Sequence, residues 1–379
     1  MKIALQLIAE RSWPAPFYTM MEVLALIPNQ HGHAPGQRSS IELWETVLAP
    51  AGINIHYAPF ETERLHEVLY RPGYYATKIS EMLRAYGERI KLLGDLKRFD
   101  AVFVYREAAL LGPAFLEKMI ARRGLPIIYQ LDDPLFVPYT SPSNGYLSYL
   151  KFFGKIAKIC SLAKVVMVNS TQIREYVSQY NQNIWQVPSV VDTKQYVFRP
   201  DLLGTRTDDV CIGWSGSPTT IGNIKVVAGA LRRLAERVEH RVHLIGGTEF
   251  DLPGVSYVAQ RWSAETEVED LRKMQVGMVP LPVNEWNKRK FYMKTAQYMA
   301  LGIPPVATPL GSNPEVIEHG VTGFIARSED EWVDYLELLI RDADLRMRMS
   351  HAAARAAQEK YSLEGNTQKI IEAFRAAVN

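Results

Sequence analysis

The sequence has little cysteine and almost no net charge. Its 379 residues include two cysteines, too few for a disulfide framework or a four-thiolate zinc site. Lys and Arg number 43 against 41 Asp and Glu, a balance of +2 that is too mild for a dedicated nucleic-acid binder. No apolar run reaches the roughly 18 residues that span a bilayer, and the first residues meet charge too early for a signal peptide. We therefore expect a cytoplasmic protein.

Two further motifs are missing. No Gly-x-Gly-x-x-Gly follows the first predicted strand, Lys2–Ile8, which argues against a dinucleotide oxidoreductase. No Asp-x-Asp pair stands at a predicted strand end, because Asp132 and Asp133 are adjacent, and His31 and His33 have no further ligands nearby in the sequence. We expect neither a metal ion nor a cofactor apart from the substrates.

Short apolar runs alternate with helical stretches, which predicts an α/β protein with mostly parallel sheets. We expect an N-terminal domain over residues 1–203, a C-terminal domain over 204–361, and a final helix over 362–379 packing near the first domain. Two doubly wound domains form a cleft at the carboxyl ends of their strands. The predicted strands after the first are Asn54–Ala58, Ala101–Tyr105, Pro126–Gln130, Val165–Asn169, Ile184–Val187, Val210–Trp214, His243–Ile245, Val255–Val258, Gly277–Pro280, Pro305–Ala307 and Thr322–Ala326.

The stretch from Lys290 to Glu315 is the part of the sequence that is most informative about function. It reads as a basic loop, a helix, a glycine cap, a buried strand and a glycine turn. Lys290 and Lys294, four residues apart, are predicted on one helical face near the helix start. Free N–H groups and the helix dipole there favour a phosphate or diphosphate. The alternative is a solvated basic face.

The same stretch, with Gly320–Phe324 after it, resembles the donor-binding signature of the group 1, or family 4, retaining glycosyltransferases. Val168–Ser170 and Ile212–Ser217 are similar to other parts of that family. The resemblance implies the GT-B architecture of two Rossmann-like domains. It also implies transfer of a hexosyl or deoxyhexosyl group from a nucleoside-diphosphate sugar to a hydroxyl acceptor, with retention.

The chain departs from the family pattern at several positions. Two glutamates eight residues apart are replaced by Arg289 and Gln297; Gln297 keeps an oxygen that can accept a ribose hydroxyl. An Arg and Lys pair after the first strand of the second domain is absent. We infer that the diphosphate is bound instead by Lys290, Lys294 and the loop of Gly216, Ser217, Thr219 and Thr220. An ordinary turn with a Ser/Thr helix cap is equally compatible with this loop.

The remaining candidates divide between donor and acceptor. By resemblance, Glu315 approaches the donor sugar, Gly311 with Ser312 and Asn313 allows close backbone approach, and Arg261 with Trp262 receives the nucleobase. Glu315 as a helix-dipole partner and Trp262 as a core residue are the alternatives. In the first domain we expect Arg38 and Arg106 to contact the acceptor, and Asp132 or Asp133 to position its hydroxyl. A turn-forming Asp-Asp-Pro is the alternative.

Residues 134–174 contain no acidic side chain. Apolar residues beside lysines within 150–164 suggest peripheral contact with the inner face of a membrane, which would suit a lipid-linked acceptor as well as a carbohydrate or small molecule. A half-buried amphipathic helix is the alternative. For the whole chain, the alternatives to a glycosyltransferase are a nucleotide-sugar epimerase and an inert nucleotide-sugar-binding or partner subunit.

Overall fold

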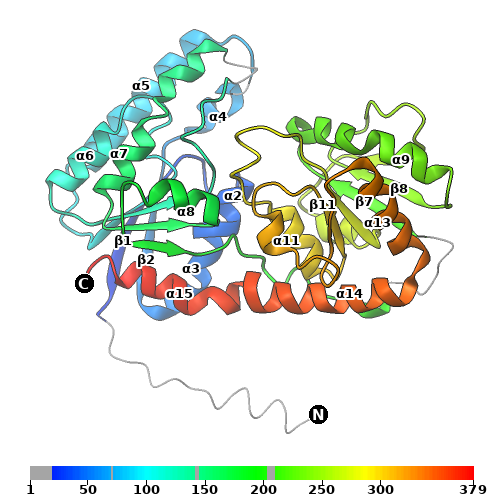
Figure 1. Ribbon diagram of the computed structural model, residues 1–379. Helices are drawn as coiled ribbons and strands as arrows, with labels where there is room; N and C mark the ends of the chain where they lie inside the picture. Colours follow the sequence, from blue (N-terminus) through cyan, green and yellow to red (C-terminus); the bar gives the residue numbers. More distant parts are fainter. Residues whose placement is uncertain (1–18, 70, 141–144, 203–209) are drawn as a thin grey trace, which may run out of the picture.

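A computed structural model describes residues 19–69, 71–140, 145–202 and 210–379. It contains two six-stranded sheets in which every described strand pair is parallel, with helices on their faces (Figure 1). The strand orders are β2-β1-β3-β4-β5-β6 and β12-β11-β10-β7-β8-β9. The α/β architecture predicted from the alternating pattern is confirmed.

The first sheet is built from short apolar runs. β3 and β4 are buried at every residue, which is why they read as continuous apolar segments. The strands are β1 (Met21–Ile27), β2 (Ile53–Pro59), β3 (Ala101–Tyr105), β4 (Ile127–Leu131), β5 (Val165–Val168) and β6 (Ile184–Gln186). The helices are α2 (Pro35–Gln37), η1 (Arg38–Glu42), α3 (Leu43–Leu48), η2 (Ala49–Ala51), α4 (Glu63–Leu69), α5 (Tyr75–Leu92), α6 (Phe115–Arg122), η3 (Tyr146–Lys151), α7 (Lys155–Leu162) and α8 (Thr171–Val177).

Sequence reasoning missed β1. The predicted first strand, Lys2–Ile8, lies outside the described residues, whereas Met21–Ile27 pairs with both β2 and β3. Glu22 stands near the start of β1, and its carboxylate accepts hydrogen bonds from Asn54 and His56 of β2. The apolar run Val23–Ile27 that follows it is as long as β3 and was overlooked.

The second sheet follows the predicted order with local differences. The predicted Val255–Val258 strand begins only at Val258, and the long helix after β7 starts as a 3-10 helix. The strands are β7 (Cys211–Ser215), β8 (Arg241–Ile245), β9 (Val258–Gln260), β10 (Val276–Val279), β11 (Pro305–Ala307) and β12 (Phe324–Ile325). η4 (Pro200–Leu202) precedes these strands. Between them and after them lie η5 (Pro218–Val227), α9 (Ala228–Ala235), α10 (Glu267–Leu271), α11 (Met293–Ala300), α12 (Asn313–Val316), α13 (Glu329–Arg341), α14 (Ala343–Ala356), η6 (Ala357–Tyr361) and α15 (Leu363–Arg375).

The chain ends on the first domain. α14 and α15 run along the base of both sheets, and α15 packs against α3 and β5 (Figure 1). Phe374 is fully buried and stacks on Phe103 of β3, with ring centroids 5.4 Å apart. The chain passes from the first domain to the second after β6 and returns after η6. The backbone N–H of Val191, in the first of these segments, donates to the carbonyl of Tyr361, in the second, so the two segments touch. The predicted boundary at residues 203 and 204 lies outside the described residues.

We predict that Phe374→Ala destabilises the first domain by about 3–5 kcal/mol, because it removes a buried aromatic ring and leaves a cavity. Chemical denaturation followed by tryptophan fluorescence measures the change. Val378→Ala, at an exposed residue of the same terminus, is the control and leaves the transition in place. Equal midpoints for the two variants would contradict a structural role for α15.

Candidate active site

The carboxyl ends of the two sheets face each other. Lys290, before α11, places its ammonium nitrogen 3.1 Å from a carboxylate oxygen of Asp133, after β4. Gln172 Nε2, at the start of α8, donates to Glu315 at 2.6 Å, and the Ser170 hydroxyl donates to the Arg289 carbonyl at 3.5 Å. The residues after the strands therefore meet along one border between the domains, which we call the crevice. Sheets of this kind bind ligands at this edge.

On the first domain, Asp132 is the centre of a buried charge cluster. Its carboxylate accepts from Tyr105 Oη at 2.6 Å and from Arg106 Nε and Nη2 at 2.7 and 2.9 Å, and the residue is 8% exposed. Arg106 adopts a left-handed backbone with φ of 64°. A Cβ on Gly36 would stand 2.8 Å from Tyr105 Oη. Glycine therefore lets the loop after β1 lie directly on this cluster.

Asp133 connects the cluster to the second domain. One carboxylate oxygen pairs with Arg106 at 2.6 Å and the other with Lys290. Burial alone would raise the pKa of Asp133, but the charges of Arg106 and Lys290 outweigh it and lower the pKa. Asp133 is thus ionised and holds a cation from each domain.

On the second domain, Lys294 belongs to a separate polar network. Its Nζ lies 2.7 Å from Glu267 Oε1, while Tyr196 Oη donates to Glu267 Oε2 at 2.9 Å. Gln297 Nε2 donates to the same Tyr196 oxygen at 2.7 Å. Burial would raise the pKa of Glu267, yet Lys294 and the hydrogen bonds to the carboxylate lower it. Trp262 contributes one of those hydrogen bonds.

This network explains the glutamine at 297. Tyr196 has one proton, and Glu267 receives it. A carboxylate at 297 would face Glu267 across that phenol, whereas an amide can donate to the phenol oxygen. The Oε1 of Gln297 is then buried and has no hydrogen-bond partner among the described residues. A hydroxyl-bearing ligand would satisfy this acceptor.

The prediction that Lys290 and Lys294 share one helical face is wrong. α11 begins at Met293, so Lys290 precedes the helix and belongs to no helix or strand. The turn after β11 holds it there: the Ser312 N–H donates to the Lys290 carbonyl at 3.1 Å. Gly311 has φ of 57°, and a Cβ on it would stand 2.2 Å from that carbonyl.

The polar atoms of this turn are occupied by the protein. Ser312 Oγ accepts from the N–H of Tyr292 at 3.0 Å. Asn313 Oδ1 accepts from the Thr295 hydroxyl at 2.7 Å, and its Nδ2 donates to the Thr308 carbonyl. Gly311, Ser312 and Asn313 therefore position Lys290 and the start of α11 rather than offering free side-chain groups to a ligand.

The other predicted residues occupy varied surroundings. Ser217 and Thr220 form a reciprocal cap at the start of η5, and Gly216 lies against Trp214, where a Cβ would stand 2.4 Å from the indole ring. The side chain of Thr219 lies outside the described residues. Arg261 is exposed and Trp262 is half-buried.

Arg38 differs from the other cations of the crevice. It is half-buried, its backbone N–H donates to the Ala34 carbonyl, and its side chain has no hydrogen bond or ion pair with a described residue. It lies close enough to Tyr196 to favour the phenolate form, although burial still raises the pKa of Tyr196. Arg38 is thus available to a negatively charged ligand at the border of the two domains.

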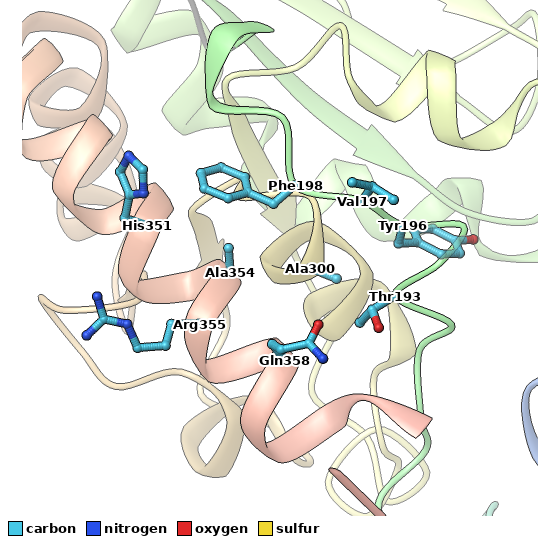
Figure 2. Close-up of a pocket in the computed structure, with 9 residues that line it drawn as sticks. All are labelled: Thr193, Tyr196, Val197, Phe198, Ala300, His351, Ala354, Arg355 and Gln358. Atoms are coloured by element: carbon cyan, nitrogen blue, oxygen red, sulfur yellow. The ribbon is translucent and has the colours of Figure 1, made fainter. Parts of the chain in front are cut away.

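A surface pocket lies beyond α11, between α14 and the segment that joins the two sheets (Figure 2). Tyr196 is shared: its ring lines the pocket, while its hydroxyl belongs to the Glu267 network. None of the sequence-predicted site residues lines this pocket. Its lining residues are Thr193, Tyr196, Val197, Phe198, Ala300, His351, Ala354, Arg355 and Gln358.

Sequence reasoning missed Glu267 and Tyr196. Glu267 stands in a run of acidic residues at the start of α10, and nothing local distinguishes it from Glu265 or Glu269.

Within the described part of the chain, no group of three or more His, Cys, Asp or Glu residues could hold a metal ion. No described helix is long and apolar enough to span a bilayer.

Two doubly wound α/β domains that face each other across a crevice define the GT-B fold. Two solved structures share it over almost the whole chain. Sucrose-phosphate synthase from Thermosynechococcus elongatus has a TM-score of 0.68 at 13% identity and covers 94% of this chain and 98% of its own. HepE from Anabaena, solved with UDP and glucose, has a TM-score of 0.63 at 14% identity and covers 94% and 100%.

The sequence comparisons agree with the fold. Residues 210–342 match the family model for "Glycosyl transferases group 1". N-acetyl-α-D-glucosaminyl L-malate synthase of Bacillus anthracis is 26% identical over 276 residues, or 69% of each chain. A Dictyostelium discoideum enzyme, GDP-Man:Man(3)GlcNAc(2)-PP-Dol α-1,2-mannosyltransferase, is 23% identical over 62% of this chain and 51% of its own length. The protein is a glycosyltransferase of the GT-B fold, and its residues 210–342 are similar to the group 1 glycosyltransferases.

Asp133→Asn tests the charge network. Because the native pKa of Asp133 is lowered, its charge stabilises the fold above about pH 5 and loses this effect as pH falls through the native pKa. We expect the variant to lose up to about 3 kcal/mol at pH 7 and progressively less below pH 4. Urea unfolding at several pH values measures this. Asp251→Asn, which breaks an exposed pair with Lys225, should change little, and a pH-independent loss in Asp133→Asn would contradict the assignment.

Proposed function

We propose that the enzyme transfers a sugar from a nucleoside-diphosphate sugar to a hydroxyl acceptor, with retention of configuration and without a metal ion. The observation that carries the proposal is the reach of Lys290 across the crevice to Asp133. A cation held at that point, with Lys294 nearby in sequence at the helix start, suits a diphosphate placed between the domains. The UDP and glucose of the HepE complex support a donor of this kind for this chain.

The chemistry requires charge stabilisation at the leaving group. As the bond between the sugar C1 and the diphosphate oxygen breaks, negative charge grows on the diphosphate, and ammonium groups there lower the barrier. In a front-face reaction the acceptor oxygen forms the new bond to C1, and its proton passes to the departing phosphate oxygen. The two lysines provide the positive charge that this step needs.

Each lysine is at present held by a carboxylate, Lys290 by Asp133 and Lys294 by Glu267. A donor diphosphate would replace or share these partners. Asp133 keeps Arg106 when Lys290 turns to the phosphate, and Glu267 keeps the hydrogen bond from Tyr196 when Lys294 does so. The ion pairs therefore hold the lysines in place before the donor binds.

The rest of the donor would extend along the second domain. The buried Oε1 of Gln297 would accept a ribose hydroxyl hydrogen, and Arg261 with Trp262 would border the base. Gly216, Ser217 and Thr220, at the start of η5, would contact the diphosphate of the donor. Glu315 would contact the donor sugar. Thr171 and Gln172 now contact Glu315, so binding there requires an exchange of partners.

The acceptor would occupy the first domain. Asp132 fixes Arg106 rather than presenting a free oxygen, so we propose Arg106 and Asp133 as the groups that orient the acceptor. Arg38, free of partners among the described residues, favours an acceptor that carries an anionic group. The L-malate in the name of the B. anthracis relative is such an acceptor.

Lys290→Ala and Lys294→Ala should each reduce kcat/KM more than tenfold, a loss of more than about 1.4 kcal/mol of transition-state stabilisation. The measurement is release of nucleoside diphosphate from a panel of nucleotide sugars, with and without hydroxyl acceptors. Lys288→Ala is the matched control, because Lys288 is exposed and pairs with Glu285 in its own loop. Unchanged kinetics in both site variants would remove the lysines from the site, and failure of every donor to react would contradict the nucleotide-sugar assignment.

A further inference from the structure

The loop after β4 and the loop before α11 meet at two points across the crevice. The ion pair of Asp133 and Lys290 is one of them. The second is aromatic: the rings of Tyr139 and Trp286 have centroids 6.2 Å apart and planes inclined by 47°. The side chain of Asp133 is 12% exposed, whereas Tyr139 is 53% exposed. The ionic contact is therefore the inner one, and the aromatic contact lies at the surface, with one ring from each domain.

The aromatic contact leaves ring surface and polar atoms open to a ligand. Trp286 is only half-buried, and an angle of 47° presents an angled surface rather than a closed stack. The hydroxyl of Tyr139 and the indole N–H of Trp286 have no hydrogen bond with any described residue. We call these two residues the aromatic platform.

Trp286 is held in place by the turn of residues 284–289. The N–H of Arg289 donates to the Trp286 carbonyl at 3.1 Å. The side chain of Asn287 donates to the Pro282 carbonyl at 2.8 Å, which ties the turn to the chain after β10. The ring of Trp286 is thus carried by a braced turn.

Tyr139 is held in place by the first domain. Its neighbour Pro138 restricts the backbone, and Phe136 stacks on Tyr176 of α8 with ring centroids 3.6 Å apart. Because both rings of the platform stand on restrained chain, a ligand that contacts them loses little free energy to ordering the protein.

The charges beside the platform are already paired. Glu285 forms ion pairs with both Lys288 and Arg289 inside the same turn. The platform therefore offers two aromatic faces and two hydrogen-bond donors, without an unpaired charge in its turn.

A sugar ring has the chemistry that fits this surface. The C–H groups of one pyranose face carry slight positive charge and pack on the negative face of an aromatic ring. Sugar oxygens can accept hydrogen bonds from the indole N–H and the phenol O–H. A lipid chain would cover the rings but leave both donors without a partner, which is unfavourable.

The basic segment of residues 150–164 does not provide such a surface through α7. Ile156 and Ile159 are buried in the core, and Lys155 is buried with its Nζ 2.7 Å from Glu107. α7 is thus the half-buried helix of the alternative interpretation.

We propose that a sugar ring of the acceptor stacks on the aromatic platform, which makes the acceptor a glycoside. The inference rests on the proposed function, because the transfer reaction is what brings an acceptor to the crevice. One turn of chain separates Trp286 from Lys290, so a ring on the platform stays close to the proposed diphosphate position. Arg38 accounts for an anionic group on the acceptor, and the platform adds a ring, which a molecule as small as L-malate lacks.

The test is isothermal titration calorimetry of the full chain with maltotetraose, mannotetraose, galactotetraose and chitotetraose. We expect at least one of these oligosaccharides to bind. Trp286→Ala should weaken that binding more than about tenfold, because it removes the larger ring of the platform. Trp286→Phe keeps an aromatic face and should restore most of the affinity, and Tyr139→Ala should weaken binding as well.

Tyr75→Ala is the matched control, because Tyr75 on α5 is 56% exposed, much like Tyr139. It should bind the oligosaccharide as the unchanged protein does. Absence of binding to all four oligosaccharides, or equal binding by Trp286→Ala, would overturn the proposal. So would a loss in Trp286→Ala that Trp286→Phe does not restore and that comes with a lower thermal unfolding midpoint, since the ring would then only brace the crevice.

Calorimetry needs no turnover, so the two proposals fail in different ways. Nucleotide sugars that react while no oligosaccharide binds would contradict the platform alone. Oligosaccharide binding that depends on Trp286, with no reaction of any nucleotide sugar, would contradict the proposed function and leave the platform as a carbohydrate site.

Discussion

The ion pair between Lys290 and Asp133 is the constraint on which the crevice depends. A carboxylate as buried as that of Asp133 needs cations to remain ionised, because burial by itself raises its pKa. Arg106 provides one cation from the first domain and Lys290 the other from the second. The electrostatic requirement of the first domain is thus completed by a residue of the second, which brings the two sheet edges together.

Two chain segments limit how the domains can move about that contact. The segment after β6 carries Tyr196 into the Glu267 network, and η6 with α15 returns from the second domain to the core of the first. A backbone hydrogen bond between Val191 and Tyr361 joins these two segments. Any opening of the crevice must therefore bend both segments near their junction, while the Lys290–Asp133 pair separates on the opposite side.

The fold was largely predictable from the sequence because parallel strands buried on both faces must be apolar. β3, β4 and β11 coincide with predicted runs to within a residue, whereas the apolar run Val23–Ile27 of β1 was overlooked. The candidate site was predictable only in part. Lys290 and Lys294 could be singled out by their spacing, but their carboxylate partners come from distant segments that sequence spacing cannot bring together. The position of Lys290 outside the helix likewise depends on a long-range turn, the approach of Gly311 to its carbonyl.

Gln297 suits the charge balance of the second domain better than a glutamate would. Glu267 already supplies one negative charge beside Lys294 and already receives the Tyr196 proton. A second carboxylate on that phenol would add repulsion with Glu267. The amide keeps an oxygen for a ligand hydroxyl and donates its own hydrogen to Tyr196. The same polar network can therefore hold a lysine for the diphosphate and an acceptor oxygen for the neighbouring sugar, provided that only one of the two side chains facing Tyr196 is charged.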